Sequence, residues 1–288
     1  MAGKKDAALV KAVTGLEGGV VGSGSTCGIV SAGALGLALI HEDRLDVPGS
    51  RDAIRDRVRQ YARWYAERSG TTLCRERTGV DFHSMGGQLA YFINPARLYR
   101  CFADIGGAVF HLHSVMEQID RAPVEVIEDA AAVPDPLYCA GAVLAGVREA
   151  TGMGDLRLER IAFVFDGGVG LSGNVCGALA GAVMATNLLF GVDSRTIGRK
   201  QTIGGFLIGH LNLFARERKQ MPEPYGIGKR IVDEFRQTTG GPLECRAITG
   251  TEFDDYNDFQ DFMAGSKTCQ DLIESATQSA IDVIERWR

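Results

Sequence analysis

The chain has 288 residues, of which 45% are hydrophobic and 23% are charged, and its formal net charge is −5. This composition is typical of a folded globular protein and excludes a wholly disordered chain. A mildly acidic chain without a block of basic residues also lacks the electrostatic signature of a nucleic-acid-binding protein. The unusual counts are 37 glycines and 7 cysteines.

The apolar segments predict buried helices rather than membrane spans. The N-terminus carries two lysines but no long apolar stretch, which argues against a secretory signal. The longest apolar segments, residues 28–40 and 175–192, are too short or too polar to cross a bilayer. We therefore expect no transmembrane segment and a cytoplasmic location. Cytoplasmic thiols stay reduced and seven cysteines cannot all pair, so structural disulfides are the least expected use of these residues.

The predicted elements are helical throughout, because apolar residues recur with a period near 3.6 residues and no alternating run is bounded by hairpin turns. In chain order we expect the two apolar helices above, an amphipathic helix ending at Gly70, a helix from Pro95 to about Ile119, a helix over residues 137–150 after Asp135 and Pro136, a helix ending near Gly241, and a helix from Cys269 to Trp287. The expected fold is all-α, with two related helical-bundle repeats packed together.

The chain repeats itself. Residues 17–28, EGGVVGSGSTCG, align without a gap with residues 166–177, DGGVGLSGNVCG. Residues 74–82, CRERTGVDF, match residues 245–253, CRAITGTEF, and a weaker match pairs Cys101 with Cys269. These matches divide the chain into a first repeat, residues 1–131, with three cysteines, and a second repeat, residues 132–288, with four. The second repeat also holds an additional segment, residues 194–224, whose role stays open.

Each glycine-rich segment places a cysteine, Cys27 or Cys176, at the start of an apolar helix. The helix macrodipole favours a thiolate there, and neighbouring glycines let backbone N–H groups approach a sulfur or an anion closely. A single buried cysteine is more commonly a packing residue. Three cysteines that recur in register across a duplication instead indicate a functional set.

The second repeat resembles the C_GCAxxG_C_C family, described as redox-active proteins and named for four cysteines and a CGAxxG motif. Residues 176–181, CGALAG, supply the motif, Cys139 resembles the leading cysteine, and Cys245 and Cys269 resemble the trailing pair. The first repeat resembles the same family, but its motif reads CGIVSA and it has no leading cysteine. It is therefore a degenerate copy. The resemblance implies redox chemistry without naming a substrate.

Four thiolates are the usual ligands of a [2Fe–2S] or [4Fe–4S] cluster. The favoured hypothesis is thus an iron–sulfur cluster that serves electron transfer or an oxidoreductase, with metal ligands Cys139, Cys176, Cys245 and Cys269. Around it, backbone N–H groups and one positive charge would tune the cluster, from Gly173, Gly177 and Arg246. The first repeat would hold the corresponding altered set, Cys27, Cys74 and Cys101.

Two alternatives stay open. In metal-free thiol chemistry, the helix-start thiolate of Cys176 attacks a substrate or a disulfide and a second cysteine resolves the product. In a non-catalytic alternative, the protein binds a soft metal or is a structural subunit whose cysteines pack. The sequence names neither the electron donor nor the acceptor, and the oligomeric state is open, with a homo-oligomer among the candidates.

Overall fold

The computed structural model describes residues 6–119, 136–193, 195 and 224–288. Within these residues the protein is all-α and has no β-strand, which confirms the expected fold class. The predicted boundary between the repeats, at residues 131 and 132, lies outside the described residues. The additional segment, residues 194–224, also lies outside them except for residues 195 and 224.

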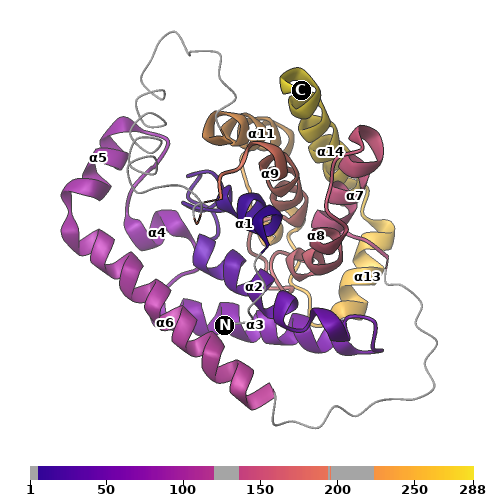
Figure 1. Ribbon diagram of the computed structural model, residues 1–288, viewed down its shortest axis with the longest axis horizontal. Coiled ribbons are helices and arrows are strands. Elements are labelled where there is room, and N and C mark those ends of the chain that lie inside the picture. The colour runs from indigo at the N-terminus through magenta and orange to yellow at the C-terminus, as the bar shows by residue number, and fades with distance from the viewer. Residues whose placement is uncertain (1–5, 120–135, 194, 196–223) are drawn as a thin grey trace.

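From the glycine-rich segments onward, the described α-helices follow one another in the same order in both repeats (Figure 1), whereas before these segments the described residues hold one α-helix in the first repeat and two in the second. Those of the first repeat are α1 (Ala7–Thr14), α2 (Gly28–Ile40), η1 (Glu42–Arg44), α3 (Ser50–Ser69), α4 (Cys74–Thr78), α5 (Met85–Ile93) and α6 (Pro95–Ile119). Those of the second repeat are α7 (Cys139–Thr151), α8 (Leu156–Ile161), η2 (Ala162–Phe165), α9 (Gly177–Phe190), α11 (Pro224–Thr239), α12 (Cys245–Thr249), α13 (Tyr256–Gly265) and α14 (Lys267–Trp287).

Most predicted helix ends are confirmed, but two helix starts differ by two residues, because the helix predicted from residue 269 begins at Lys267 and the one predicted from residue 137 begins at Cys139. Helix α3 ends where Gly70 takes the left-handed conformation at φ 84°, and α6 begins after Asn94, whose side chain accepts a hydrogen bond from the N–H of Ala96. Helix α7 begins at Cys139 rather than directly after Pro136, with Tyr138 in an extended conformation before it. The extended backbone lets the Tyr138 ring pack against Phe259, with ring centroids 5.5 Å apart.

Helix α9 lies at the centre of the molecule. Every residue from Gly177 to Asn187 is buried, and α9 packs against α1, α7, α11 and α14, as Figure 1 shows. The larger of two hydrophobic clusters runs through both repeats, and the smaller one surrounds Cys139 and Cys245. The prediction that residues 175–192 form a buried helix is thus confirmed over α9. Among the described residues, no helix combines the length and apolarity that a bilayer crossing requires.

Both glycine-rich segments fold into the same left-handed turn. Residues 18–22 and residues 167–171 all have positive φ, between 52° and 79°. Glycine tolerates this conformation, but other residues are strained in it by about 1 to 2 kcal/mol each. Val20 and Val169, at φ 64° and 61°, occupy the same place in the two turns and are fully buried. Burial of these side chains offsets the strain and holds each turn in one conformation.

The left-handed turns hold the cysteines of each repeat in register. The N–H of Cys27 donates to Thr72 O at 2.7 Å, and that of Cys176 donates to Leu243 O at 2.8 Å. In return, the N–H of Cys74 donates to Ser25 O at 2.8 Å, and that of Cys245 donates to Asn174 O at 2.6 Å. Two cysteines that are far apart in sequence are therefore tied together by backbone hydrogen bonds in each repeat.

Candidate four-cysteine redox site

The four cysteines of the second repeat all lie near the start of a helix. Cys139 and Cys245 are the first residues of α7 and α12, Cys176 is the N-cap of α9, and Cys269 is the third residue of α14. All four line one small cavity of about 10 Å³, the four-cysteine cavity. Its volume is about that of a single water-sized probe, so the site is closed around its own side chains.

Two glycines of the CGAxxG motif allow Cys139 to reach Cys176. A Cβ built on Gly177 would lie 2.6 Å from the Cβ of Cys139, and one on Gly181 would lie 2.8 Å from the carbonyl oxygen of Ala140. Both distances are shorter than any normal carbon contact. The absence of side chains at these positions therefore lets the first turn of α7 lie directly on α9, with Cys139 beside the motif cysteine.

A third glycine makes room for Cys245. A Cβ on Gly168, in the left-handed turn, would lie 2.7 Å from the Cβ of Cys245 and 2.6 Å from the backbone of Asn174. Gly168 also has φ 79°, which favours glycine on conformational grounds alone. The turn thus positions the cysteine of α12 as closely as the motif glycine positions that of α7.

The rest of the four-cysteine cavity is apolar. Aromatic residues of α13 and the preceding loop cover it, with Phe253 in edge-on contact with Phe259 and Phe262 at centroid distances of 5.3 Å. Aliphatic side chains close the remaining sides, namely Ile248, Met263, Leu272 and Ile273. An apolar enclosure of this kind disfavours charge, so it controls the protonation of the thiols.

Burial raises the pKa of each thiol in the four-cysteine cavity. After burial, the next largest cause that raises the pKa of Cys139 is the negative charge of Asp166. For Cys245, the next causes are the charges of Cys176 and Cys269. Burial also raises the pKa of Cys176, to about 11, although the backbone N–H groups of Ala178 and Leu179 oppose that shift. The cysteines are therefore neutral thiols at neutral pH, and Cys176 retains backbone donors that favour its thiolate.

Cys139 has a strained backbone. Its φ is 41°, in the left-handed region, although it is neither a glycine nor an asparagine. Such a conformation costs on the order of 1 to 3 kcal/mol and persists only where the surroundings hold it. Cys139 packs directly against Gly177. The carbonyl oxygen of Phe165 also lies close to Gly177, 2.8 Å from where a Cβ on that residue would be, so the cysteine has little space. The strain supports a role for Cys139 that ordinary packing would not require.

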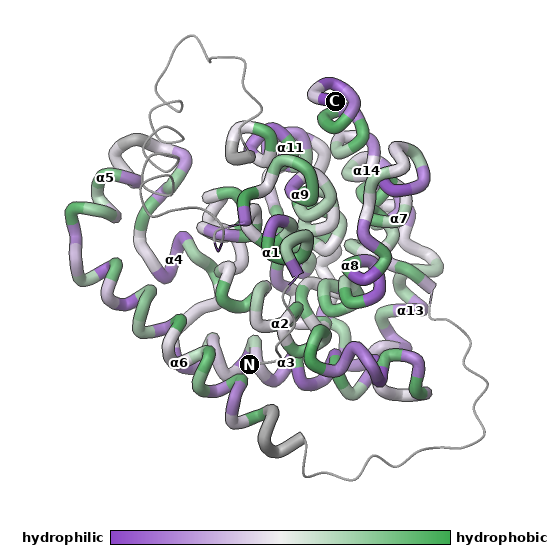
Figure 2. The backbone as a smooth tube through the Cα atoms, viewed as in Figure 1, coloured by the Kyte–Doolittle hydropathy of each residue, from purple (hydrophilic) through white to green (hydrophobic). Residues whose placement is uncertain are grey.

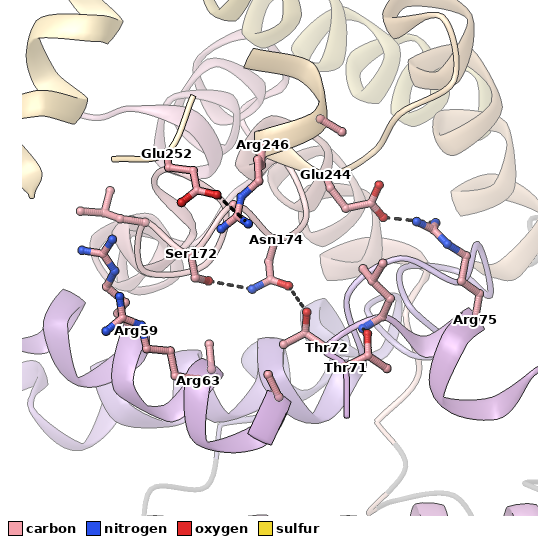
Figure 3. Close-up of a pocket in the computed structure, with 16 residues that line it drawn as sticks. Arg59, Arg63, Thr71, Thr72, Arg75, Ser172, Asn174, Glu244, Arg246 and Glu252 are labelled. Atoms are coloured by element: carbon pink, nitrogen blue, oxygen red, sulfur yellow. Dashed lines mark hydrogen bonds and ion pairs between the residues drawn. The ribbon is translucent and has the colours of Figure 1, made fainter. Parts of the chain in front are cut away.

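Gly173 and Arg246 lie on a different surface from the four-cysteine cavity. They line a groove of about 540 Å³ between the repeats, shown in Figure 3, which also contains Arg59, Arg63 and Arg75. Arg246 pairs with Glu252 at 2.8 Å, and its N–H donates to Gly173 O at 3.2 Å. Of the three residues predicted to surround a cofactor, Gly177 alone contacts one of the four cysteines.

The three cysteines of the first repeat line a separate cavity of about 680 Å³, the three-cysteine cavity. The hydroxyl of Tyr65 donates a hydrogen bond to the Sγ of Cys27 at 3.3 Å. Burial raises the pKa of Cys27 and of Cys74, and the charges of Cys27 and Cys101 raise that of Cys74 further. The first repeat thus gathers its cysteines as the second does, but around a far larger space.

Sequence reasoning missed the buried ion pair next to the site. Asp166 is 1% exposed and lies 3.5 Å from the guanidinium of Arg55, which is 2% exposed. Arg55 also lies over the ring of Tyr256, 3.4 Å from its centroid. An acidic residue recurs at the same position of the first repeat, as Glu17. That recurrence was the signal in the sequence that this position has a specific role.

The donor set suits an iron–sulfur cluster in chemistry but not in arrangement. Four thiols are the usual complement for such a cluster. Among residues 6–119, 136–193, 195 and 224–288, however, no group of three or more His, Cys, Asp or Glu side chains is arranged to hold a metal ion. The free space of about 10 Å³ in the cavity fits about one water-sized probe, which is too small for a cluster of several iron and sulfide ions. The residues as arranged do not fit a cluster.

The fold and site define an all-helical, internally duplicated protein with a buried cysteine cluster in its second repeat. A family model described as "Putative redox-active protein (C_GCAxxG_C_C)" matches residues 1–110 and 137–283. The chain belongs to this family, and the match is split over two segments. No curated protein and no solved structure matches the chain.

Proposed function

We propose that the four-cysteine cavity is a thiol–disulfide redox centre. The observation that carries the proposal is that Cys139, Cys176, Cys245 and Cys269 line one closed apolar cavity with no room for another group. Once one of these thiols has formed a mixed disulfide with a partner, a second thiol held beside it displaces that partner more readily than a thiol from solution does.

Cys176 and Cys269 are the pair we expect to form the disulfide. Cys269 is the least buried of the four, so a partner reaches it first. The charge of Cys269 raises the pKa of Cys176, so the two thiols influence each other directly. Cys176 also has the backbone N–H groups of Ala178 and Leu179, which stabilise its own thiolate when it attacks the mixed disulfide.

The reaction is an exchange with a disulfide of a partner molecule. The Cys269 thiolate attacks one partner sulfur, the partner S–S bond breaks, and the first partner thiol leaves with the proton that Cys269 lost. Cys176 then attacks the Cys269 sulfur of the mixed disulfide and its proton goes to the second partner thiol. Two protein thiols are oxidised, one partner disulfide is reduced, and no other oxidant is needed.

An iron–sulfur cluster is the second candidate, because the cavity brings together four thiols, the donor set that such clusters use. That function requires the helix starts at Cys139 and Cys245 to move apart on loading. The cluster would then serve one-electron transfer in place of disulfide exchange.

Disulfide mapping tests the proposal. The reduced full-length protein is titrated with oxidised dithiothreitol and with diamide, alkylated under denaturing conditions and analysed by mass spectrometry. We expect one intrachain disulfide, Cys176–Cys269, that dithiothreitol reverses. Cys176→Ser and Cys269→Ser should each abolish it, whereas the matched variant Cys74→Ser in the first repeat should leave it intact.

A parallel reconstitution with iron and sulfide under anaerobic conditions distinguishes the second candidate. Stable iron binding with visible absorption that is lost in Cys176→Ser would establish the cluster and displace the disulfide centre. Free thiols at all four positions after oxidation, together with no bound iron, would overturn both functions.

A further inference from the structure

The three-cysteine cavity lies on the face of α2 that corresponds to the face of α9 covered by α7. In the second repeat the first turn of α7 packs on Gly177 and Gly181 of α9. Their counterparts in the first repeat, Gly28 and Ala32, line the three-cysteine cavity instead. Ala32 is exposed there. Among the described residues, Gly28 and Ala32 therefore face a cavity of about 680 Å³ in place of a packed helix start.

A shift of the third cysteine enlarges this space. Cys269 is the third residue of α14, whereas Cys101 is one helical turn further from the start of α6. The cysteines Cys27, Cys74 and Cys101 therefore surround an opening rather than one another. Cys27 and Cys101 are partly exposed, and Cys74 is buried.

The covering side chains differ in polarity between the repeats. The alignment of residues 74–82 with residues 245–253 can be extended toward the C-terminus. It then pairs Gln88 of the first repeat with Phe259 of the second, and Tyr91 with Phe262. Gln88 lines the three-cysteine cavity and is 4% exposed. Its Nε2 donates to Phe82 O at 2.6 Å, but its Oε1 is buried with no hydrogen-bond partner among the described residues. A buried acceptor beside the cavity is thus left for a ligand with a donor group.

The charge of the cavity selects against anions. Apart from its cysteines and tyrosines, the residues that line the cavity include one ionisable residue, Glu17. The lining contains no lysine, arginine or histidine. Glu17 is exposed to solvent, and no basic residue of the lining compensates a negative charge there. The remaining lining is mainly aromatic and aliphatic, including Tyr61, Phe82 and Tyr91. Such walls suit an apolar molecule that is neutral or positively charged.

The cavity is open to solvent along α5 and α6, which run along one edge of the molecule in Figure 1. Phe92, Ile105 and Val109 line it and are also 38%, 45% and 45% exposed. Figure 2 shows hydrophobic positions recurring along α6. An apolar molecule can therefore reach the thiols from outside.

We propose that the first repeat binds an apolar, uncharged or cationic disulfide in the three-cysteine cavity and reduces it with Cys27 and Cys101. The proposal rests on the thiol chemistry proposed for the second repeat. One substrate sulfur takes the place that the leading cysteine holds in the second repeat. Acidic disulfides are excluded by Glu17 and by the lack of a basic residue.

The exchange is balanced without a further reactant. The Cys27 thiolate attacks one substrate sulfur, the substrate S–S bond breaks, and the departing thiolate takes up the proton that Cys27 lost. Cys101 attacks the Cys27 sulfur of the mixed disulfide, and its proton goes to the second substrate thiol. The protein gains a Cys27–Cys101 disulfide and the substrate disulfide becomes two thiols.

The test compares three disulfides with the reduced full-length protein: lipoamide, which is neutral and apolar, cystamine, which is cationic, and oxidised glutathione, which is anionic. The rate of Cys27–Cys101 formation is measured by quenched alkylation and mass spectrometry. Each rate is divided by the rate for the same protein unfolded in urea, which removes differences in intrinsic reactivity. We expect lipoamide and cystamine to exceed oxidised glutathione by at least tenfold.

Two variants separate binding from thiol chemistry. Ala32→Leu places a larger side chain in the three-cysteine cavity and leaves every thiol in place. It should therefore slow the lipoamide reaction at least tenfold. Ala103→Leu, at an exposed position of α6 that does not line the cavity, should leave it unchanged. Glu17→Gln should raise the rate with oxidised glutathione toward that with lipoamide.

The outcomes distinguish this inference from the function of the second repeat. If Cys176–Cys269 forms on oxidation but Cys27 and Cys101 stay reduced with lipoamide and cystamine, the inference fails and the proposed function stands. Equal normalised rates for all three disulfides, or no effect of Ala32→Leu, would also overturn it. If neither repeat forms a disulfide with any oxidant, the proposed function fails as well.

Discussion

Gly177 and Cys139 are in such close contact that a methyl group on the glycine would occupy the space of the cysteine side chain. The distance from an ideal Gly177 Cβ to the Cβ of Cys139 would be 2.6 Å, and Phe165 O would lie at 2.8 Å. Both neighbours are held in place, one by the start of α7 and one by η2. The glycine of the motif therefore determines where the leading cysteine lies.

Gly177→Ala should destabilise the protein by about 1 to 3 kcal/mol, the usual cost of overpacking a core, because neither neighbour can yield freely. The free energy of urea unfolding under reducing conditions is the measurement. Gly36→Ala is the matched control: Gly36 lies in a helix with nothing within 4 Å of its added Cβ, so alanine should stabilise α2 by about 0.5 to 1 kcal/mol. Equal effects of the two substitutions would contradict the steric account.

The same contact explains how much of the site the sequence could predict. The repeated glycines and cysteines indicated the helix starts at Cys27 and Cys176, because a left-handed turn needs glycine at the same places in each copy. The all-α fold followed from helical periodicity and cap residues. These are local properties, and they depend on neighbouring residues in the chain.

Features that depend on packing between distant segments were not predicted. The position of Arg246 away from the cysteines follows from its ion pair with Glu252 and its backbone bond to Gly173. The volume of the three-cysteine cavity depends on how α2, α5 and α6 pack around it, which a pattern of residues does not show. Helix α7 begins at Cys139 and not at the predicted residue 137, because Tyr138 stays extended and its ring packs on Phe259.

The pKa of Cys176 predicts a loss of stability at alkaline pH. The thiol has an ordinary pKa of 9.0, which the folded protein raises to about 11. Between these values the unfolded chain has lost the proton while the folded protein keeps it, so rising pH favours unfolding. The stability contribution is fully present below pH 9 and is lost by about pH 11. The free energy of unfolding should fall by about 1.4 kcal/mol per pH unit for this thiol.

Comparison with Cys176→Ser isolates this effect, because serine does not titrate in this range and the other buried thiols are common to both proteins. From pH 9 to pH 11, the free energy of urea unfolding of the unsubstituted protein should fall by about 2 to 3 kcal/mol more than that of Cys176→Ser. A difference that is constant with pH would show that the Cys176 thiol is not held in its neutral form.

Arg55 and Asp166 link the repeats through a buried ion pair. Both side chains are 2% exposed, and their atoms lie 3.5 Å apart. Replacing Arg55 by methionine keeps much of the side-chain volume but leaves the carboxylate of Asp166 in a buried environment beside Cys139. Arg55→Met should therefore destabilise the protein by about 3 to 5 kcal/mol, as is typical when one partner of a buried pair is removed.

A double-mutant cycle on urea unfolding checks the coupling. Asp166→Asn in the Arg55→Met background should restore part of the loss, because it removes the uncompensated charge. Arg63→Met, at an exposed position of the same helix, should change stability by no more than about 0.5 kcal/mol. Additive effects of the two substitutions would mean that the pair is not coupled.

Tyr65 controls the reactivity of Cys27. Its hydroxyl donates to the Sγ of Cys27 at 3.3 Å, and this hydrogen bond lowers the pKa of a thiol that burial raises. Tyr65→Phe should raise the pKa of Cys27 further and slow its alkylation by iodoacetamide at fixed pH. The expected factor is about five, which corresponds to a hydrogen bond of about 1 kcal/mol.

The alkylation rate is measured peptide by peptide under native conditions, with Cys101 as the reference in the same sample. Tyr61→Phe is the matched control, because the Tyr61 hydroxyl lies on the same helix but donates to Ile29 O at 2.9 Å rather than to a sulfur. It should leave the ratio of Cys27 to Cys101 alkylation unchanged. If Tyr61→Phe lowers that ratio as much as Tyr65→Phe does, the change reflects altered access to the three-cysteine cavity, and the hydrogen bond to Cys27 does not set its reactivity.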